Sequence, residues 1–152
     1  MIPDQIHIRV ASADDVPALW QLFSSILPKD SASIHENTDE FTTILSGLVK
    51  NPTVFIYVAT VLNNIIGVIL ASIKKKKLVF GSERIGVIEW LYLSESYRGE
   101  ALSKKLVNKV LIQFRLNKID FAEARLYNDV DKALWQNLGF SQHMLTLRKD
   151  IS

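Results

Sequence analysis

The feature that most constrains the fold is a buried-strand pattern that leads directly into a helical one. Residues 84–93, RIGVIEWLYL, form an apolar stretch typical of a largely buried strand. After an Arg-Gly pair at 98–99, apolar residues recur at helical spacing over 102–114. Another strand pattern follows at 119–127. Together these segments predict a β-α-β unit with a right-handed crossover.

The remaining patterns place further strands and helices around this unit. The lysine run at 74–77 lies near a chain reversal and is expected to be a solvated hairpin end. The order β-α-α-β-β-β-α-β-α-β predicts a single α/β domain over residues 1–152, with one mixed sheet. The expected additional elements are a strand at 6–11, helices at 12–27 and 37–49, a hairpin of two strands turning at Asn63-Asn64, a short helix at 129–139 and a last strand at 140–150.

Composition excludes several classes of protein. The chain has no cysteine, so disulfides, thiolate metal sites and a cysteine acyl-enzyme are ruled out. Its net charge of +2 argues against a dedicated nucleic-acid binder. The three histidines show no metal-binding spacing, and no metal is expected. No signal-peptide pattern or membrane-spanning run is present in the sequence, so we expect a cytoplasmic protein without a membrane partner, either a monomer or a homodimer.

The junction between the strand and the helix is a candidate phosphate site. The first N–H groups of a helix lack intrahelical partners and, with the helix dipole, attract anions. Arg98 adds a planar guanidinium that fits phosphate oxygens, and Lys104 and Lys105 add positive charge one turn later. Gly99 is expected to let the backbone turn sharply and approach a ligand closely. The alternative is that these cations form a solvated helix face.

Three stretches together resemble the GNAT superfamily of acyl-CoA-dependent N-acyltransferases. IEWLYLSESYRGEALSKKLV is similar to the central motif of that family, Arg/Gln-x-x-Gly-x-Gly/Ala, whose backbone amides hold the CoA pyrophosphate. IRVASADDVPALWQLF resembles the family's first strand and helix, and LYNDVDKALWQNLGF its closing motif. The resemblance implies a GNAT-like acyl-CoA N-acyltransferase fold, acetyl-CoA as co-substrate and an amine as acceptor.

The resemblance also implies which residues hold the coenzyme. Two positions depart from the family pattern: Ala101 stands where glycine is usual, and Ser103 where glycine or alanine is usual. Each added side-chain atom reduces the clearance for a pyrophosphate, although the Ser103 hydroxyl can donate to a phosphate oxygen. The implied coenzyme-binding residues are Leu91, Leu93, Arg98, Gly99, Glu100, Ala101, Leu102, Ser103, Lys104, Asn128 and Trp135.

Glu89 is the candidate general base, because family members often carry an acidic residue in this strand that helps to deprotonate the amine. The alternative is a structural carboxylate paired with Arg84 or Arg125. Strand alternation places the residues of this segment on two faces. We expect Glu89, Leu91 and Leu93 on one face, and Trp90 and Tyr92 on the other.

The general acid is harder to assign. Where the family commonly has a tyrosine that protonates the departing thiolate, this chain has Trp135, whose indole N–H is only a hydrogen-bond donor. Tyr92 or Tyr127 is the candidate replacement. Alternatively, Trp135 is simply a core aromatic residue.

We therefore predict an N-acetyltransferase that moves an acetyl group from acetyl-CoA to a primary amine by direct attack in a ternary complex. The expected acceptor is a small molecule, a polyamine or a peptide or protein amine. Acidic residues in the polar stretch 28–40 would favour a cationic acceptor. The alternatives are a weak or inactive acyl-CoA-binding regulatory module, and a structural subunit that binds no coenzyme.

Overall fold

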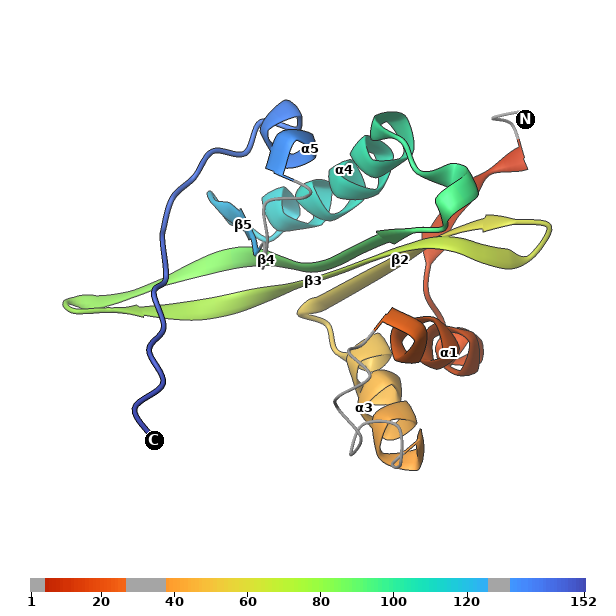
Figure 1. Ribbon diagram of the computed structural model, residues 1–152, viewed down its shortest axis with the longest axis horizontal. Helices are drawn as coiled ribbons and strands as arrows, with labels where there is room; N and C mark the ends of the chain where they lie inside the picture. The colour runs from red at the N-terminus through yellow and green to blue at the C-terminus, as the bar shows by residue number, and fades with distance from the viewer. Residues whose placement is uncertain (1–4, 27–37, 126–131) are drawn as a thin grey trace.

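A computed structural model describes residues 5–26, 38–125 and 132–152, which form a layered α/β structure around one sheet (Figure 1). The five strands lie in the order β1-β2-β3-β4-β5. Neighbours from β1 to β4 are antiparallel, and β4 pairs with β5 in parallel. The mixed sheet predicted from the sequence is confirmed. The strands are β1 (His7–Val10), β2 (Val54–Val61), β3 (Asn64–Leu78), β4 (Gly81–Leu93) and β5 (Ala122–Ala124).

Helices cover both faces of the sheet. Figure 1 shows α1 and α3 below it, and α4 and α5 above it. The predicted order of helices is confirmed for the described residues. Within these residues, no helix is long and apolar enough to cross a membrane. The helices are α1 (Val16–Ile26), α3 (Thr38–Lys50), α4 (Glu100–Leu116) and α5 (Lys132–Asn137), with short 3-10 turns η2 (Ala13–Asp15) and η3 (Glu95–Tyr97).

Two apolar clusters fix the helices to the sheet, one on each face. On the first face, Leu106, Val110 and Phe114 of α4 pack against strand residues that include Ile69 and Ile88. On the opposite face, residues of α1 and α3 pack against alternating residues of β2 and β3. Strand alternation and helical periodicity therefore agree along most of the chain, because each element presents one apolar surface to a different cluster.

The β2–β3 hairpin turns one residue earlier than predicted. Leu62 and Asn63 have φ values of 50° and 67°, so they occupy the two central positions of the turn. Asn64 already pairs with Val61 in the ladder. The sequence signal of two asparagines located the hairpin correctly but not its register, because the structure accepts a leucine in the left-handed region at this exposed turn.

The lysine run at 74–77 lies near the end of the β3–β4 hairpin, close to a chain reversal as predicted, but in the paired strand and not in the turn. All four lysines lie inside β3 and pair with residues 82–85 of β4. The reversal lies beyond them, where Val79 and Phe80 are 90% and 95% exposed. Strand alternation sends Lys74 and Lys76 to the face of α1 and α3, and Lys75 and Lys77 to the face of α4.

The last predicted strand is also wrong. Residues 141–152 are exposed and form neither helix nor strand, and Figure 1 shows this segment running away from α5 past the β3–β4 hairpin. The preceding strand, predicted at 119–127, is only three residues long in the described part of the chain. The apolar pattern of the C-terminal segment resembles a strand, but nothing in the described residues pairs with it.

The N-terminus of the first helical segment is fixed by a buried carboxylate. Asp15 is 8% exposed and accepts hydrogen bonds from both terminal nitrogens of Arg9, at 2.7 and 2.8 Å. It also accepts from the Ser12 backbone N–H at 2.7 Å. The Arg9 hydrogen bonds, followed by the Ser12 N–H, hold the pKa of Asp15 below its usual value despite burial.

Gly86 tests the packing of α4 on the sheet. A Cβ at this position would overlap the ring of Phe114, which is 2% exposed. We expect Gly86→Ala to lower the free energy of unfolding by about 1–3 kcal/mol in urea denaturation. Gly47 of α3 has open space, so Gly47→Ala should raise stability by up to about 1 kcal/mol. Equal effects of the two substitutions would contradict this packing.

Asp15 predicts a specific acid sensitivity. Because its folded-state pKa is depressed, the stabilisation is present above the unfolded-state value of about 4 and is lost as pH falls through the folded-state value. Asp15→Asn should lower the free energy of unfolding by about 1–3 kcal/mol at pH 7. The difference between the variant and the wild type should shrink below about pH 4, as measured by urea titration at each pH. A difference independent of pH would contradict the prediction.

Candidate functional site

The candidate site lies where β4 separates from β5. The two strands pair only from Gly86–Ala122 to Ile88–Ala124 in the described residues. At the next position β4 contains a bulge: Leu70 pairs with Trp90 and Ala71 with Ile88, which leaves Glu89 as the extra residue. A bulge bends its strand and increases the local twist. The β4–β5 pairs of the described residues stop immediately before this bulge.

Glu89 is held by Lys74 at this bulge. The Lys74 ammonium donates to Glu89 Oε1, and the side chains are 42% and 27% exposed. The partner is thus neither Arg84 nor Arg125. Lys74 lies four residues after Leu70, on the face that packs against α1 and α3, so Glu89 is reached from that same face.

The predicted distribution of side chains along β4 was partly wrong for this reason. Leu91 and Leu93 pack on the α4 side, and Trp90 and Tyr92 on the side of α1 and α3, as expected. The bulge interrupts the alternation, and the Lys74 ion pair places Glu89 with Trp90 and Tyr92 instead of with the two leucines. The candidate base and one candidate acid, Tyr92, consequently share a face.

The end of β4 presents backbone groups to the open side. The Ser94 N–H donates to Ile66 of β3 at 2.7 Å, whereas the Leu93 carbonyl accepts from Arg98 Nε at 3.3 Å and so points away from β3. Since backbone groups alternate along a strand, the N–H groups of Leu91 and Leu93 also point away from β3. A ligand in the gap between β4 and β5 would meet these groups.

Helix α4 begins immediately beyond this edge. Its first helical hydrogen bond runs from Ser103 N–H to Gly99 oxygen, at 3.2 Å. The amides of Glu100, Ala101 and Leu102 precede that bond and donate to no other described residue. Three N–H groups at the positive end of a 17-residue helix therefore remain available to an anion.

Gly99 contributes space and does not supply the predicted sharp turn. Its φ of 176° and ψ of 155° are extended, a conformation open to other residues. A Cβ built there would meet nothing within 4 Å. The glycine therefore leaves the approach to the helix N-terminus unobstructed.

The charged residues predicted at this junction are exposed. Arg98 uses Nε for the Leu93 carbonyl, and its two terminal nitrogens bond no other described residue. Lys104 lies on the exposed surface of the first turn of α4, together with Glu100 and Ala101. An anion at the helix N-terminus would thus meet a guanidinium and an ammonium.

The small residues of the motif have different positions. Ala101 is exposed, so its methyl group adds bulk to the open surface. Ser103 is only 2% exposed, and its side chain lies beneath the turn with Leu102, which is 8% exposed. The role of the Ser103 hydroxyl toward a phosphate stays a prediction. The small size of Ser103 allows α4 to lie close to the sheet.

Trp135 belongs to the hydrophobic core. It is 7% exposed and contacts Phe140 edge to face, with ring centroids 5.1 Å apart. This position supports the core alternative rather than contact with the coenzyme. The predicted roles of Tyr127 and Asn128 fall outside the described residues.

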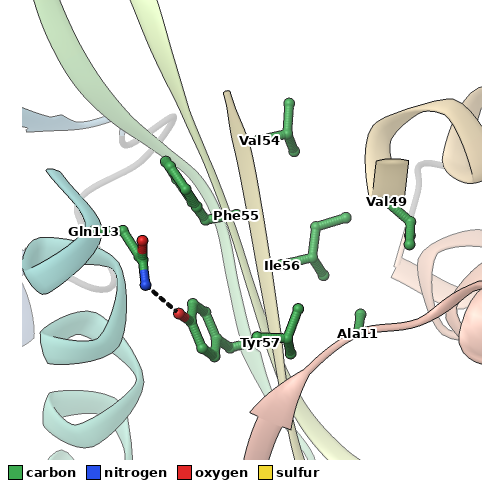
Figure 2. Close-up of a pocket in the computed structure, with 8 residues that line it drawn as sticks. Ala11, Val49, Val54, Phe55, Ile56, Tyr57 and Gln113 are labelled. Atoms are coloured by element: carbon green, nitrogen blue, oxygen red, sulfur yellow. Dashed lines mark hydrogen bonds between the residues drawn. The ribbon is translucent and has the colours of Figure 1, made fainter. Parts of the chain in front are cut away.

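A separate cavity lies at the opposite edge of the sheet (Figure 2). It has a volume of about 190 Å³ and opens where β2 extends past the end of β1. Gln113 Nε2 donates to the Tyr57 hydroxyl across it, at 3.1 Å. Gln113 lies about 20 Å along α4 from Gly99, so this cavity is distinct from the phosphate-binding candidate.

The Lys74–Glu89 pair and the bulge were missed from the sequence. The only available signal was the lysine run itself, which was interpreted as a solvated end. Asp39 and Glu40, from the predicted acidic loop, lie in the first turn of α3 and are exposed. No group of three His, Asp or Glu side chains in the described ranges is placed to hold a metal ion.

Residues 16–140 match the Acetyltransferase (GNAT) family. The chain belongs to this family. No match was found among curated proteins. Solved structures of the same fold include a predicted acetyltransferase from Clostridium acetobutylicum with acetyl-CoA, at 15% identity and a TM-score of 0.77, covering 96% of each chain.

Two aminoglycoside acetyltransferases share the GNAT fold. One, an aminoglycoside N-acetyltransferase in complex with CoA, has a TM-score of 0.80 and 15% identity over 100% of both chains. The other, an aminoglycoside antibiotic 6′-N-acetyltransferase from Acinetobacter baumannii, has a TM-score of 0.72 and 20% identity over 97% of this chain and 99% of that chain. At these identities the likeness establishes the fold.

Proposed function

We propose that this GNAT protein is an N-acetyltransferase that transfers the acetyl group of acetyl-CoA to a primary amine. The observation that carries the proposal is the helix N-terminus beyond Gly99, which combines three available amides with an exposed guanidinium. Two proteins of the same fold were solved with acetyl-CoA or CoA. That this fold holds acetyl-CoA or CoA in those two proteins supports acetyl-CoA as the co-substrate.

The first turn of α4 would bind the pyrophosphate. The amides of residues 100–102 supply N–H donors, and the helix dipole favours the negative charge. The terminal nitrogens of Arg98 fit phosphate oxygens, and Lys104 adds charge without a fixed geometry. The exposed Ala101 methyl group reduces the clearance for the pyrophosphate at this turn, so we expect weaker binding of acetyl-CoA than with glycine at this position.

The free edge of β4 would align the acetyl-bearing arm. The N–H groups of Leu91 and Leu93 point away from β3, toward the side on which β4 diverges from β5. An extended amide-containing chain can add to such an edge as a strand would. A main-chain N–H directed at the thioester carbonyl would stabilise the oxyanion that forms on attack.

Glu89 would act on the acceptor amine. It takes a proton from the ammonium, and the neutral nitrogen attacks the thioester carbonyl carbon directly. A C–N bond forms, the C–S bond breaks, and the departing thiolate takes up a proton. No cysteine is available for a covalent thioester intermediate, which favours this ternary-complex route.

The proton donor to the thiolate is Tyr92 in this proposal. It lies on the same face as Glu89, whereas Trp135 is in the core and lacks a suitable proton. A general acid typically contributes about 10²- to 10⁴-fold in rate. A thiolate is nevertheless a tolerable leaving group, so positioning alone would support slow transfer.

The position of Trp135 also favours a second function, an acyl-CoA-binding module with little turnover. The tyrosine usual at this place in the family would supply the acid, and this chain has a core indole instead. Measuring acetyl-CoA binding and thiol release on the same preparation separates the two functions. Binding without release from a broad amine panel would favour the module.

Gly99→Ala tests the pyrophosphate site without disturbing the fold. Because a Cβ meets nothing within 4 Å, the free energy of unfolding should change by less than about 0.5 kcal/mol. The same Cβ would stand in the path to the helix N-terminus, so the Kd for acetyl-CoA should rise about tenfold in isothermal titration. Gly47→Ala is the control and should leave the Kd unchanged. An unchanged Kd in Gly99→Ala would contradict the site.

Glu89→Gln tests the general base. The amide keeps the size of the side chain but cannot accept the proton, so kcat should fall by about 10²- to 10⁴-fold in a thiol-release assay. The Kd for acetyl-CoA should stay within about twofold of the wild type. Glu83→Gln, further out on β4, is the control and should retain full activity. Unchanged kcat in Glu89→Gln would exclude the base role.

A further inference from the structure

Two carboxylates near the β4–β5 edge, on the face where Glu89 lies, are each paired with a lysine. Glu89 is paired with Lys74, and the neighbouring carboxylate, Glu123 of β5, accepts from Lys76 Nζ at 2.9 Å. Both lysines project from β3 toward the face of α1 and α3. Glu89 and Glu123 thus each have their own cation, whereas Glu83, opposite Lys76 in the ladder, has no ion pair with a described residue. The paired carboxylates attract cations less strongly than the carboxylates of an unpaired acidic patch would.

The Lys74–Glu89 pair restricts which amines can use the site. An incoming ammonium must replace Lys74 on the Glu89 carboxylate. One ion pair is then exchanged for another, and the displaced Lys74 ammonium is left beside a second positive charge. Like charges at such separations repel, most strongly where water is partly excluded. A simple cation, and still more a polycation, therefore gains little from binding.

An acceptor with its own anionic group avoids this cost. Its ammonium pairs with Glu89, and its anion pairs with the displaced Lys74. One internal ion pair is replaced by two intermolecular ones. Because the Lys74 and Glu89 charged groups are in direct contact, the two groups of the acceptor must also lie close together, as in an α- or β-amino acid.

We propose that the acceptor is a zwitterionic amine, with a carboxylate near the amino group, and that Lys74 is the residue that selects it. This inference rests on the proposed acetyltransferase function and specifies the substrate class of that site. Lys74 determines specificity by its charge, while Glu89 remains the base. The aminoglycoside acetyltransferases of the same fold are only 15% and 20% identical to this chain, so their acceptors do not indicate the acceptor class of this protein.

The reaction itself would favour product release. The zwitterion loses one proton to Glu89, the nitrogen bonds to the acetyl carbon, and the C–S bond breaks. The second amine proton is lost as the thiolate is protonated. The product is a neutral amide with a carboxylate, and it no longer carries an ammonium for Glu89. Once Glu89 has released the proton it took from the amine to solvent, its carboxylate can pair with Lys74 again, which restores the resting ion pair.

The test compares matched acceptors with matched variants. Wild type, Lys74→Met and Lys75→Met are assayed for thiol release with β-alanine, L-phenylalanine and other amino acids, with the amide of each, and with 1,4-diaminobutane. Amino acid and amide share a side chain and differ in the anion. Lys75 is the control because it is the adjacent lysine but projects from the opposite face of β3. Acetyl-CoA binding is measured for every variant.

We expect the wild type to prefer at least one amino acid over its amide by tenfold or more in kcat/KM. Lys74→Met should abolish that preference, with the ratio falling to about one, whereas Lys75→Met should retain it. The inference would be overturned if the wild type preferred the amides or the diamine. It would also be overturned if the ratio of kcat/KM between amino acid and amide were unchanged in Lys74→Met. Acetyl-CoA binding without turnover of any amino acid would overturn it too. Absence of acetyl-CoA binding would instead contradict the proposed function.

Discussion

The divergence of β4 from β5 is the constraint on which the rest of the site depends. β4 is paired with β3 from Gly81 to Leu93 except at Glu89, so it cannot move independently of the sheet. Among the described residues its pairing with β5 ends at Ile88, and the bulge at Glu89 follows immediately. One extra residue therefore opens a backbone edge, turns a carboxylate to the face of α1 and α3, and directs the strand into the N-terminus of α4.

The two apolar clusters make this arrangement rigid. On one face, the Phe114 ring lies so close to Gly86 that a side chain there has no room, which fixes α4 near the start of the β4–β5 pairing. On the other face, the buried residues of α1 and α3 cover the middle of the sheet. The reactive groups thus lie on elements whose positions are set by packing, and the unpaired amides of α4 keep a constant direction relative to the β4 edge.

Much of the fold could be predicted from the sequence because periodicity reports which surface is buried. The stripe Leu102, Leu106, Val110 and Phe114 predicted α4, and all four residues are buried in one cluster. Alternation failed where the backbone departs from regular geometry. The bulge at Glu89 has no residue signature, since any side chain can be the extra one.

Other features depended on partners distant in the sequence. The sequence pattern predicted that Lys74 and Lys76 belong to a solvated run, but each pairs with a carboxylate, 15 and 47 residues away in the sequence. The apolar pattern over 140–150 predicted a strand, but a strand also needs to pair with a neighbour, and this segment pairs with no strand of the described chain. Ser103 was expected at the ligand surface and is buried, because the first turn of α4 presents Glu100 and Ala101 outward instead.

The measurement that tests the central claim most directly is an amide-resolved NMR titration of the 17.2 kDa chain with coenzyme A. If the nucleotide is held at the start of α4, the largest chemical-shift changes should fall on the backbone amides of Gly99 to Leu102, with smaller changes at Leu91 and Leu93. Changes concentrated around Tyr57 and Gln113, with the amides beyond Gly99 unaffected, would contradict the account.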